Sequence, residues 1–270
     1  MIFPSIDLEA GRTVQLVGGE ELAVDAGDPR PIFDGFRPEF LRQLPRERLV
    51  AAVDGRDGEV VTHGWRKKTG VSVASRVREL RDDVDGFLVT FVESEGRRTG
   101  LPMDRIDELV DAAGSARLCV AGGVARAEEV AILDAKGVDV QVGMGLYQGD
   151  FDIAACIFSM LKSEREDGLV PTIVCDPYGV ALGLTWSSEA SLRAALSSGR
   201  GVYQSRKRGL WKKGESSGAT QELLRVSIDC DRDALRFLVR QGAPGFCHRR
   251  TQTCFDDDLG VGALERRLHA

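Results

Sequence analysis

The sequence predicts a chain of two domains: an N-terminal α/β partial (β/α) barrel and a C-terminal α+β domain. Apolar runs alternate with helical stretches up to about residue 162, which is typical of βα units around a parallel sheet. A polar segment over residues 163–168 then ends in glycine, and the pattern changes. A chain of 270 residues with 43% hydrophobic residues has the length for two domains. We place them at residues 1–163 and 168–270.

The N-terminal domain is predicted to contain about five strands, because five apolar or β-branched runs end in polar residues. They cover residues 2–7, 49–54, 86–90, 117–121 and 138–142. Apolar residues recur at every third or fourth position between most of these runs, which predicts helices. The predicted helices cover residues 69–80, 104–113, 127–136 and 153–161, and the proline-rich stretch 29–45 is expected to be irregular.

The C-terminal domain lacks this alternation. Residues 170–176 predict a strand, and residues 172–186 predict two strands around a Pro-Tyr-Gly turn. A helix over residues 188–197 and a strand over residues 222–229 complete the predicted elements. This mixture favours an α+β domain.

Charge and cysteine content exclude several classes of protein. The 36 basic and 42 acidic residues give a net charge of −6, which argues against non-specific binding to nucleic acid. No apolar run is long enough to span a membrane, and no leader pattern precedes the first strand, so we expect a cytoplasmic protein. The six cysteines are too sparse for a secreted disulfide scaffold.

The C-terminal region concentrates residues that bind metals. Asp229, Asp231 and Asp233 alternate along the chain, so in an extended conformation their carboxylates share one face while Cys230 points away. The pattern therefore predicts two separate metal sites. The carboxylates suit a hard ion such as Mg²⁺, whereas the thiolates suit Zn²⁺. The zinc ligands in this interpretation are Cys230, Cys247 and Cys254.

Three protein ligands leave the fourth position of zinc open, which favours hydrolysis over a purely structural site. His248, next to Cys247, is the candidate general base because it can take a proton from water and return it to a leaving nitrogen. The alternative is a zinc knuckle that only stabilises a small domain.

Residues 203–218 form a basic, glycine- and serine-rich run with five cations and one carboxylate. Such a run with an aromatic residue suits a phosphate group next to a nucleobase. It predicts a nucleotide-like ligand, although basic clusters are usually solvated surface.

Three motifs together resemble phosphoribosyl-AMP cyclohydrolase. They are Ser-Arg-x-Arg-x-x-Leu-Trp-x-Lys-Gly-Glu-x-Ser-Gly, Asp-Cys-Asp-x-Asp-Ala-Leu and Cys-His-x₅-Cys-Phe, and the likeness covers about residues 170–260. The resemblance implies a homodimeric enzyme of the third step of histidine biosynthesis, which uses zinc and magnesium to hydrolyse the N1–C6 bond of the adenine ring.

The same resemblance implies roles for individual residues. His248 matches the catalytic histidine, the three cysteines match a zinc site shared between subunits, and the three aspartates match the magnesium ligands. The substrate-binding residues implied by the basic run are Ser205, Arg206, Arg208, Trp211, Lys213, Glu215 and Ser217.

The N-terminal domain resembles phosphoribosylformimino-carboxamide ribotide isomerase, a (β/α)₈ barrel. The likeness rests on the first strand and turn and on runs similar to its fifth, seventh and eighth strands: residues 4–16, 51–65, 121–124 and 142–149. Asp7 and Asp54 match the paired acid and base of that family. Five strands cannot close an eight-stranded barrel, so we do not predict these two residues to be catalytic.

Two alternatives for the whole chain and two for its N-terminal domain remain open. The chain is bifunctional if the N-terminal domain keeps isomerase activity, and it is a non-enzymatic, zinc-stapled nucleotide-binding protein if the metal site is closed. The half-barrel itself serves packing or oligomerisation, or it binds the product through the glycine turns at residues 122–123 and 143–145.

Overall fold

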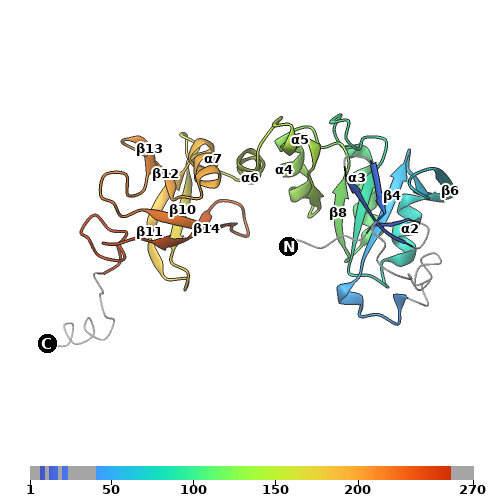
Figure 1. Cartoon of the computed structure of the whole chain (residues 1–270), viewed down its shortest axis with the longest axis horizontal. Helices are drawn as coiled ribbons and strands as arrows, with labels where there is room; N and C mark the ends of the chain where they lie inside the picture. The colour runs from blue at the N-terminus through green and yellow to red at the C-terminus, as the bar shows by residue number, and fades with distance from the viewer. Residues whose placement is uncertain (1–6, 10–11, 18–19, 24–40, 257–270) are drawn as a thin grey trace. The chain divides into compact units, whose positions relative to one another are not determined.

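The computed structural model describes residues 7–9, 12–17, 20–23 and 41–256, the first three segments by their backbone alone. Two compact units divide the chain, Met1–Asp150 and Phe151–Ala270, and each is described by itself (Figure 1). In the part of the chain that the structure describes, no helix is long and apolar enough to cross a membrane.

The division between the units lies earlier than the boundary that the sequence predicts. Helix α6 (Ile153–Met160) forms nearly where expected but belongs to the second unit. Ala154 is buried in the core of that unit, and Ile157 and Phe158 pack against the same core. The polar segment over residues 163–168 is therefore a connection inside the second unit, because the apolar face of α6 finds its partners after it.

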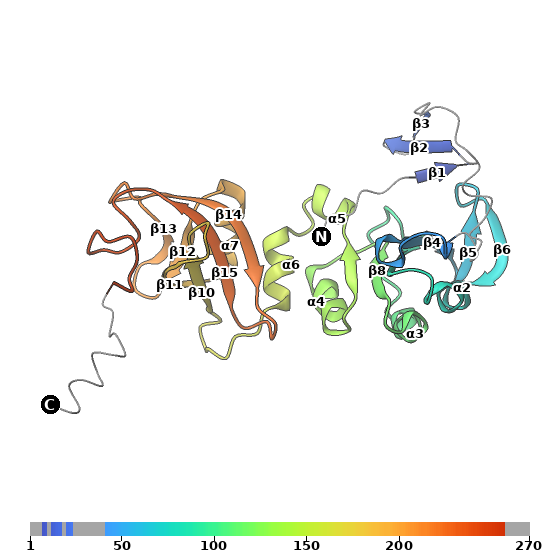
Figure 2. The same ribbon diagram turned by 90° about the horizontal axis from the view of Figure 1, so that it is seen from below.

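The first unit contains a six-stranded sheet with the order β6-β5-β4-β7-β8-β9. Four of these strands are parallel, β4 (Val50–Arg56), β7 (Gly86–Phe91), β8 (Arg117–Ala121) and β9 (Asp139–Gln141). The helices between and after them are α2 (Val73–Leu80), α3 (Met103–Ala113), α4 (Ala127–Ala135) and α5 (Met144–Tyr147). Helices α2, α3 and α4 lie on one side of the sheet (Figure 2). The predicted partial (β/α) architecture is confirmed.

Two predicted elements of this unit differ from the structure. The N-terminal part of the helix expected over residues 69–80 is strand β6 (Lys67–Ser72), which pairs antiparallel with β5 (Glu59–Thr62). The helix begins after Ser72, whose Oγ accepts the backbone N–H of Ser75 at 3.1 Å. This N-cap and the pairing with β5 override the helical pattern of the preceding residues.

The described end of the first predicted strand, Asp7, lies outside the parallel sheet. Asp7 lies in β1 (Asp7–Glu9), which pairs antiparallel with β2 (Arg12–Val17), and β3 (Glu20–Ala23) completes a separate three-stranded sheet. Residues 2–6 and most of the proline-rich stretch 29–45 lie outside the described residues; a short 3₁₀ turn, Arg46–Arg48, follows that stretch. The described parallel strands thus number four rather than five, because the start of the chain pairs with its own neighbour.

The second unit contains a four-stranded mixed sheet with the order β11-β10-β15-β14. The strands are β10 (Val170–Cys175), β11 (Ala181–Ser187), β14 (Gln221–Ile228) and β15 (Leu235–Gln241). The Pro-Tyr-Gly turn joins β10 to β11 as predicted, and Asp176 Oδ1 accepts the backbone N–H groups of Tyr178 and Val180 at 2.9 Å. The predicted α+β class is confirmed.

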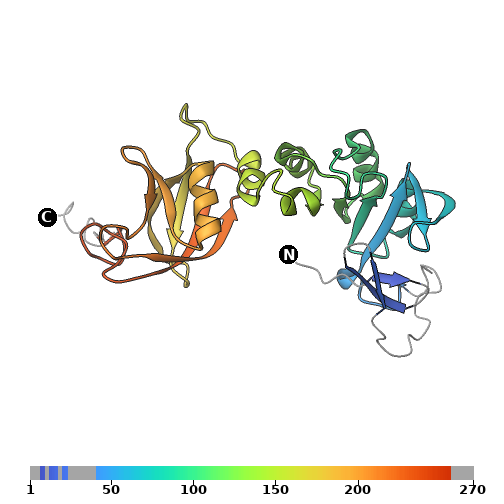
Figure 3. The same ribbon diagram turned by 45° about the horizontal axis from the view of Figure 1, so that its top comes forward.

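Helix α7 (Glu189–Ser198) covers one face of this sheet (Figure 3). Ser188 caps its first turn by accepting the backbone N–H of Ser191, and Gly199 ends it in the left-handed conformation at φ 63°. A two-stranded hairpin, β12 (Val202–Ser205) and β13 (Gly209–Lys212), adds to the same core.

A buried chain of hydrogen bonds ties the hairpin to the main sheet. The hydroxyl group of Tyr203, which is fully buried, donates to Gln221 Oε1 at 2.6 Å, and Gln221 Nε2 donates to Gln241 Oε1 at 2.8 Å. The Tyr203 ring also lies 5.5 Å from that of Phe237. Each buried polar group in this series of hydrogen bonds has a partner. The hydrogen bonds therefore fix the hairpin and compensate the cost of removing these groups from water.

Gly183 leaves room for the side chain of Phe246, which directly precedes Cys247, a predicted zinc ligand. A Cβ atom at Gly183 would lie 2.2 Å from Cε1 of Phe246, whose ring is buried against β11. We expect Gly183→Ala to displace this ring and to lower the free energy of unfolding by roughly 1–3 kcal/mol, as overpacking in a core does. Urea denaturation followed by tryptophan fluorescence measures the change. An unchanged transition would show that the ring moves at no cost.

Candidate functional site

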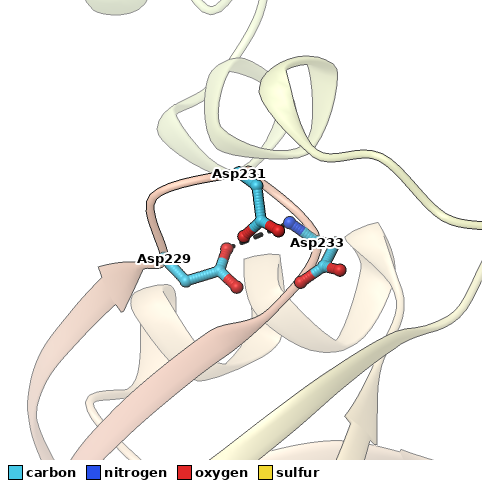
Figure 4. A group of neighbouring side chains, drawn as sticks. All are labelled: Asp229, Asp231 and Asp233. Carbon is cyan, nitrogen blue, oxygen red and sulfur yellow. Dashed lines mark hydrogen bonds between the residues drawn. The ribbon is translucent and has the colours of Figure 1, made fainter.

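The three aspartates come together in the turn that joins β14 to β15 (Figure 4). Carboxylate oxygens of Asp229, Asp231 and Asp233 lie within 4.8 Å of one another. The sequence argument for their proximity was wrong in its geometry, since strand β14 ends at Ile228 and Arg232 takes a left-handed conformation at φ 67°. A turn, not the alternation of a strand, gathers the carboxylates.

Backbone hydrogen bonds hold this turn. Asp229 Oδ1 accepts the N–H groups of Asp233 and Ala234, both at 3.0 Å. Burial raises the pKa of Asp229, but these hydrogen bonds outweigh that effect and leave the pKa below its usual value. The contact with Asp229 and the charge of Asp231 raise the pKa of Asp233. A hard cation would relieve this repulsion, and its preferred ligands are the oxygens present here.

Two of the three predicted zinc ligands lie together after β15. Cys247 is 8% exposed, and its Sγ accepts the backbone N–H of Arg249 at 3.5 Å. The backbone N–H of Cys254 donates to the carbonyl oxygen of Leu182 at 2.8 Å and anchors the segment to β11. The backbone of the unit thus presents a pair of neighbouring thiols.

The two thiols titrate differently because they contact each other. The hydrogen bond from Arg249 lowers the pKa of Cys247, against the effect of burial, and the contact with Cys254 lowers it further. Burial and the neighbouring Cys247 raise the pKa of Cys254 to about 11. A soft cation that binds both sulfurs would displace the proton between them.

Cys230 is not part of this pair. It is exposed in the aspartate turn before β15, whereas Cys247 follows the end of that strand. Strand β15, with seven residues at about 3.3 Å each, is roughly 20 Å long and lies between the two positions in the chain. One chain therefore brings together two of the predicted zinc ligands and holds the third at the other end of the sheet.

His248 lies beside the thiol pair. Its side chain is exposed, and Nδ1 is 3.9 Å from Cys247 Sγ. This position leaves the imidazole ring accessible to a substrate and to water near the thiols. It suits a group that exchanges protons during a reaction.

The basic run forms a hairpin rather than the loop that its composition suggests. Tyr203 pairs with Trp211, and Ser205 pairs with Gly209. The β-branched and aromatic residues of the two strands favour this pairing. Ser205 Oγ accepts the backbone N–H of Arg208 at 3.2 Å and shapes the tip. The hairpin exposes the side chains of Arg206, Lys207 and Arg208 at this tip.

Aromatic rings support the two arginines of the tip. The Arg208 guanidinium lies 5.6 Å from the centroid of the Trp211 ring. The Arg206 guanidinium lies 5.6 Å from the centroid of the Trp186 ring. The Arg165 guanidinium lies 4.5 Å from the same centroid. Sequence reasoning did not identify Trp186, because it lies in β11, far from the basic run, and only the fold brings the two together.

The remaining predicted substrate contacts divide into two groups. Glu215 and Ser217 are exposed in the turn after β13, where Ser217 Oγ accepts the backbone N–H of Ala219 at 3.4 Å. Lys213, in contrast, is only 9% exposed, and its Nζ lies 5.1 Å from the centroid of the Phe246 ring. Lys213 is therefore buried against Phe246, which directly precedes Cys247 of the thiol pair.

The first unit presents a pocket at the carboxyl ends of its parallel strands. Its lining includes Glu95, Arg98 and the glycine turns at residues 122–123 and 143–145. Both oxygens of Asp150 accept from Arg98 Nη1 at 2.8 Å. Nearby, Asp54 accepts the indole N–H of Trp65 at 2.9 Å, and burial together with the charge of Asp54 raises the pKa of Glu95. The side chain of Asp7 lies outside the described residues.

Comparisons with known proteins match a different family to each of the two units. The model of the phosphoribosyl-AMP cyclohydrolase family matches residues 183–256, and that of the histidine biosynthesis protein family matches residues 34–152. A phosphoribosyl-AMP cyclohydrolase of Hyphomonas neptunium is 44% identical over 101 residues, which cover 37% of this chain and 76% of that protein.

Two fungal relatives are much longer than this chain. The "Histidine biosynthesis bifunctional protein his7" of Schizosaccharomyces pombe is 50% identical over 116 residues, 43% of this chain and 28% of that protein. The "Histidine biosynthesis trifunctional protein" of Neurospora crassa is 46% identical over 144 residues, 53% of this chain and 16% of that protein. The matched regions span less than a third of these relatives.

The fold and these matches relate the chain to proteins of histidine biosynthesis. More specifically, the chain belongs to the phosphoribosyl-AMP cyclohydrolase family through its second unit, and its first unit is a domain of the histidine biosynthesis protein family. Both resemblances that the sequence motifs indicate are confirmed.

Proposed function

We propose that the chain hydrolyses the N1–C6 bond of the adenine ring of phosphoribosyl-AMP, the third step of histidine biosynthesis. The family match over residues 183–256 carries this proposal, because it covers the thiol pair, the aspartate turn and His248 together. In the reaction a water oxygen forms a bond to C6, the C6–N1 bond breaks, and N1 takes up a proton and leaves C6 as an amidine nitrogen still bonded to C2, while C6 becomes a carboxamide carbon.

The residues of the chain supply the proton transfers of this reaction. His248 takes a proton from the attacking water and returns one to N1 as the ring opens, for which its exposed position beside the thiols is suited. Zinc held by Cys230, Cys247 and Cys254 would supply Lewis acidity at this place. The exposed tip of the hairpin, with Ser205, Arg206 and Arg208, binds the phosphate group, and Trp211 offers an aromatic surface to the base.

The zinc site is shared in a homodimer in this proposal. Because Cys230 and Cys247 lie beyond opposite ends of β15, Cys230 joins the thiol pair of a second copy. A twofold axis repeats the contact, so each dimer holds two equivalent sites. The aspartate turn next to Cys230 is the proposed magnesium site.

Chelation tests the metal part of the proposal. We expect the chain to open the ring of phosphoribosyl-AMP in an absorbance assay, to lose this activity after treatment with a strong chelator, and to regain it when zinc and magnesium are restored. Full activity without metal would contradict the metal assignment. No ring opening by the metal-loaded protein would contradict the proposed reaction and favour a zinc-stapled binding protein.

We propose no isomerase activity for the first unit. Its described sheet has four parallel strands, and Asp7 lies in a different sheet from Asp54. The paired acid and base of the isomerase family would have to meet inside one closed barrel, which the described strands do not build.

A further inference from the structure

Lys213 places a buried positive charge next to Phe246, the residue that precedes Cys247 of the thiol pair. It follows β13, and its backbone N–H donates to the carbonyl oxygen of Gly201 at 2.9 Å. The residue is 9% exposed, and its Nζ lies 5.1 Å and 5.8 Å from the ring centroids of Phe246 and Trp211. These two faces stabilise a cation but do not neutralise it.

This ammonium group has no acidic partner among residues 41–256: no carboxylate lies within 4.0 Å of Nζ, and no side-chain hydrogen bond is formed. Burying a charge without a counter-ion is costly. The groups that interact electrostatically with it are the thiols of Cys254 and Cys247, which follow Phe246 in the chain. Among the described residues, the buried positive charge of Lys213 is therefore left without a carboxylate anion as counter-ion.

The charge of the proposed zinc site supplies a counter-ion. Three thiolates on a divalent ion carry a net charge of about −1, which one ammonium group balances. We propose that Lys213 is a positioning residue of the zinc centre: its ammonium group balances the thiolates of Cys247 and Cys254 and raises the affinity of the protein for zinc. This inference rests on the proposed zinc site, and it gives Lys213 a role different from the substrate contact that the motif implies.

The positions of the other cations support this division of roles. Arg206 and Arg208 are exposed at the tip of the hairpin, where a phosphate group can reach them. The Lys213 side chain is buried, and its ammonium group contacts the rings of Trp211 and of Phe246, the residue that directly precedes Cys247. Side chains that act on the ligands of a metal site, without binding the metal themselves, commonly change metal affinity 10- to 100-fold.

Zinc affinity without substrate tests the inference. In the full chain, Lys213→Met and Lys213→Gln should each bind zinc about 10- to 100-fold more weakly than wild type, measured by competition with a chromophoric chelator. Lys213→Arg should keep most of the affinity because it keeps the charge. Lys212→Met is the matched control: Lys212 is the exposed neighbour on β13, and its loss should leave zinc binding unchanged.

The outcomes separate this inference from the proposed function. Wild-type zinc affinity in Lys213→Gln, with a raised KM for phosphoribosyl-AMP, would make Lys213 a substrate contact and overturn the inference while leaving the zinc site intact. A wild-type protein that binds no zinc would overturn both. If Lys213→Met does not fold, as judged by circular dichroism, the comparison between Lys213→Gln and Lys213→Arg decides.

Discussion

Mixing the Cys230→Ser and Cys254→Ser proteins should restore ring-opening activity that neither variant has alone. Each variant lacks one ligand in both sites of its own dimer. In a mixed dimer, Cys230 of the Cys254→Ser chain meets the intact thiol pair of the Cys230→Ser chain, so one site of two is complete. Random mixing should give about a quarter of the wild-type activity, because about half of the dimers are mixed.

A second pair of variants controls this experiment. Cys247→Ser and Cys254→Ser both damage the thiol pair, so no arrangement of the two chains contains an intact pair, and we expect no restoration. Co-expression with two affinity tags isolates the mixed dimers for both pairs. Mixed dimers of Cys230→Ser and Cys254→Ser that form, fold and remain inactive would contradict the shared site.

His248→Ala should reduce turnover by roughly 10²-fold or more, as the loss of a general acid and base does. Zinc content and the free energy of unfolding should stay near wild type, because the exposed imidazole ring packs against little of the core. Steady-state kinetics, metal analysis and urea denaturation measure the three quantities on the same preparation.

Gln252→Ala provides a matched control for this variant. Gln252 is exposed in the same segment, and its backbone carbonyl, which accepts the N–H of Phe246 at 3.2 Å, is kept in the variant. Its turnover should equal that of wild type. Unchanged turnover in His248→Ala would remove this residue from the mechanism, and loss of zinc would identify the imidazole as a fourth ligand of a closed site.

The parallel strands of the first unit were predictable because a strand buried on both faces is a continuous apolar run. Strand β7, predicted over residues 86–90, is found at Gly86–Phe91 with most of its residues buried. Strand β6 was not predictable: residues 67–72 have no apolar alternation, and their pairing with β5 decides their conformation.

The candidate site shows the same contrast. The spacing of Asp229, Asp231 and Asp233 indicated that the carboxylates meet, but the turn that gathers them depends on the positive φ of Arg232 and on backbone hydrogen bonds to Asp229. The burial of Lys213 had no signal in the basic run, because burial depends on Phe246, a residue distant in the sequence.

The sequence by itself determined which chemistry the chain carries, since the types and short spacings of its thiols, carboxylates and imidazole are local properties of the chain. Only the tertiary structure decided which of these groups meet. Strand β15 (Leu235–Gln241) lies between Cys230 and Cys247 in the chain, and Phe246, which packs against Gly183, also contacts Lys213. Distances across a fold depend on how strands pair and side chains pack, and no local pattern contains them.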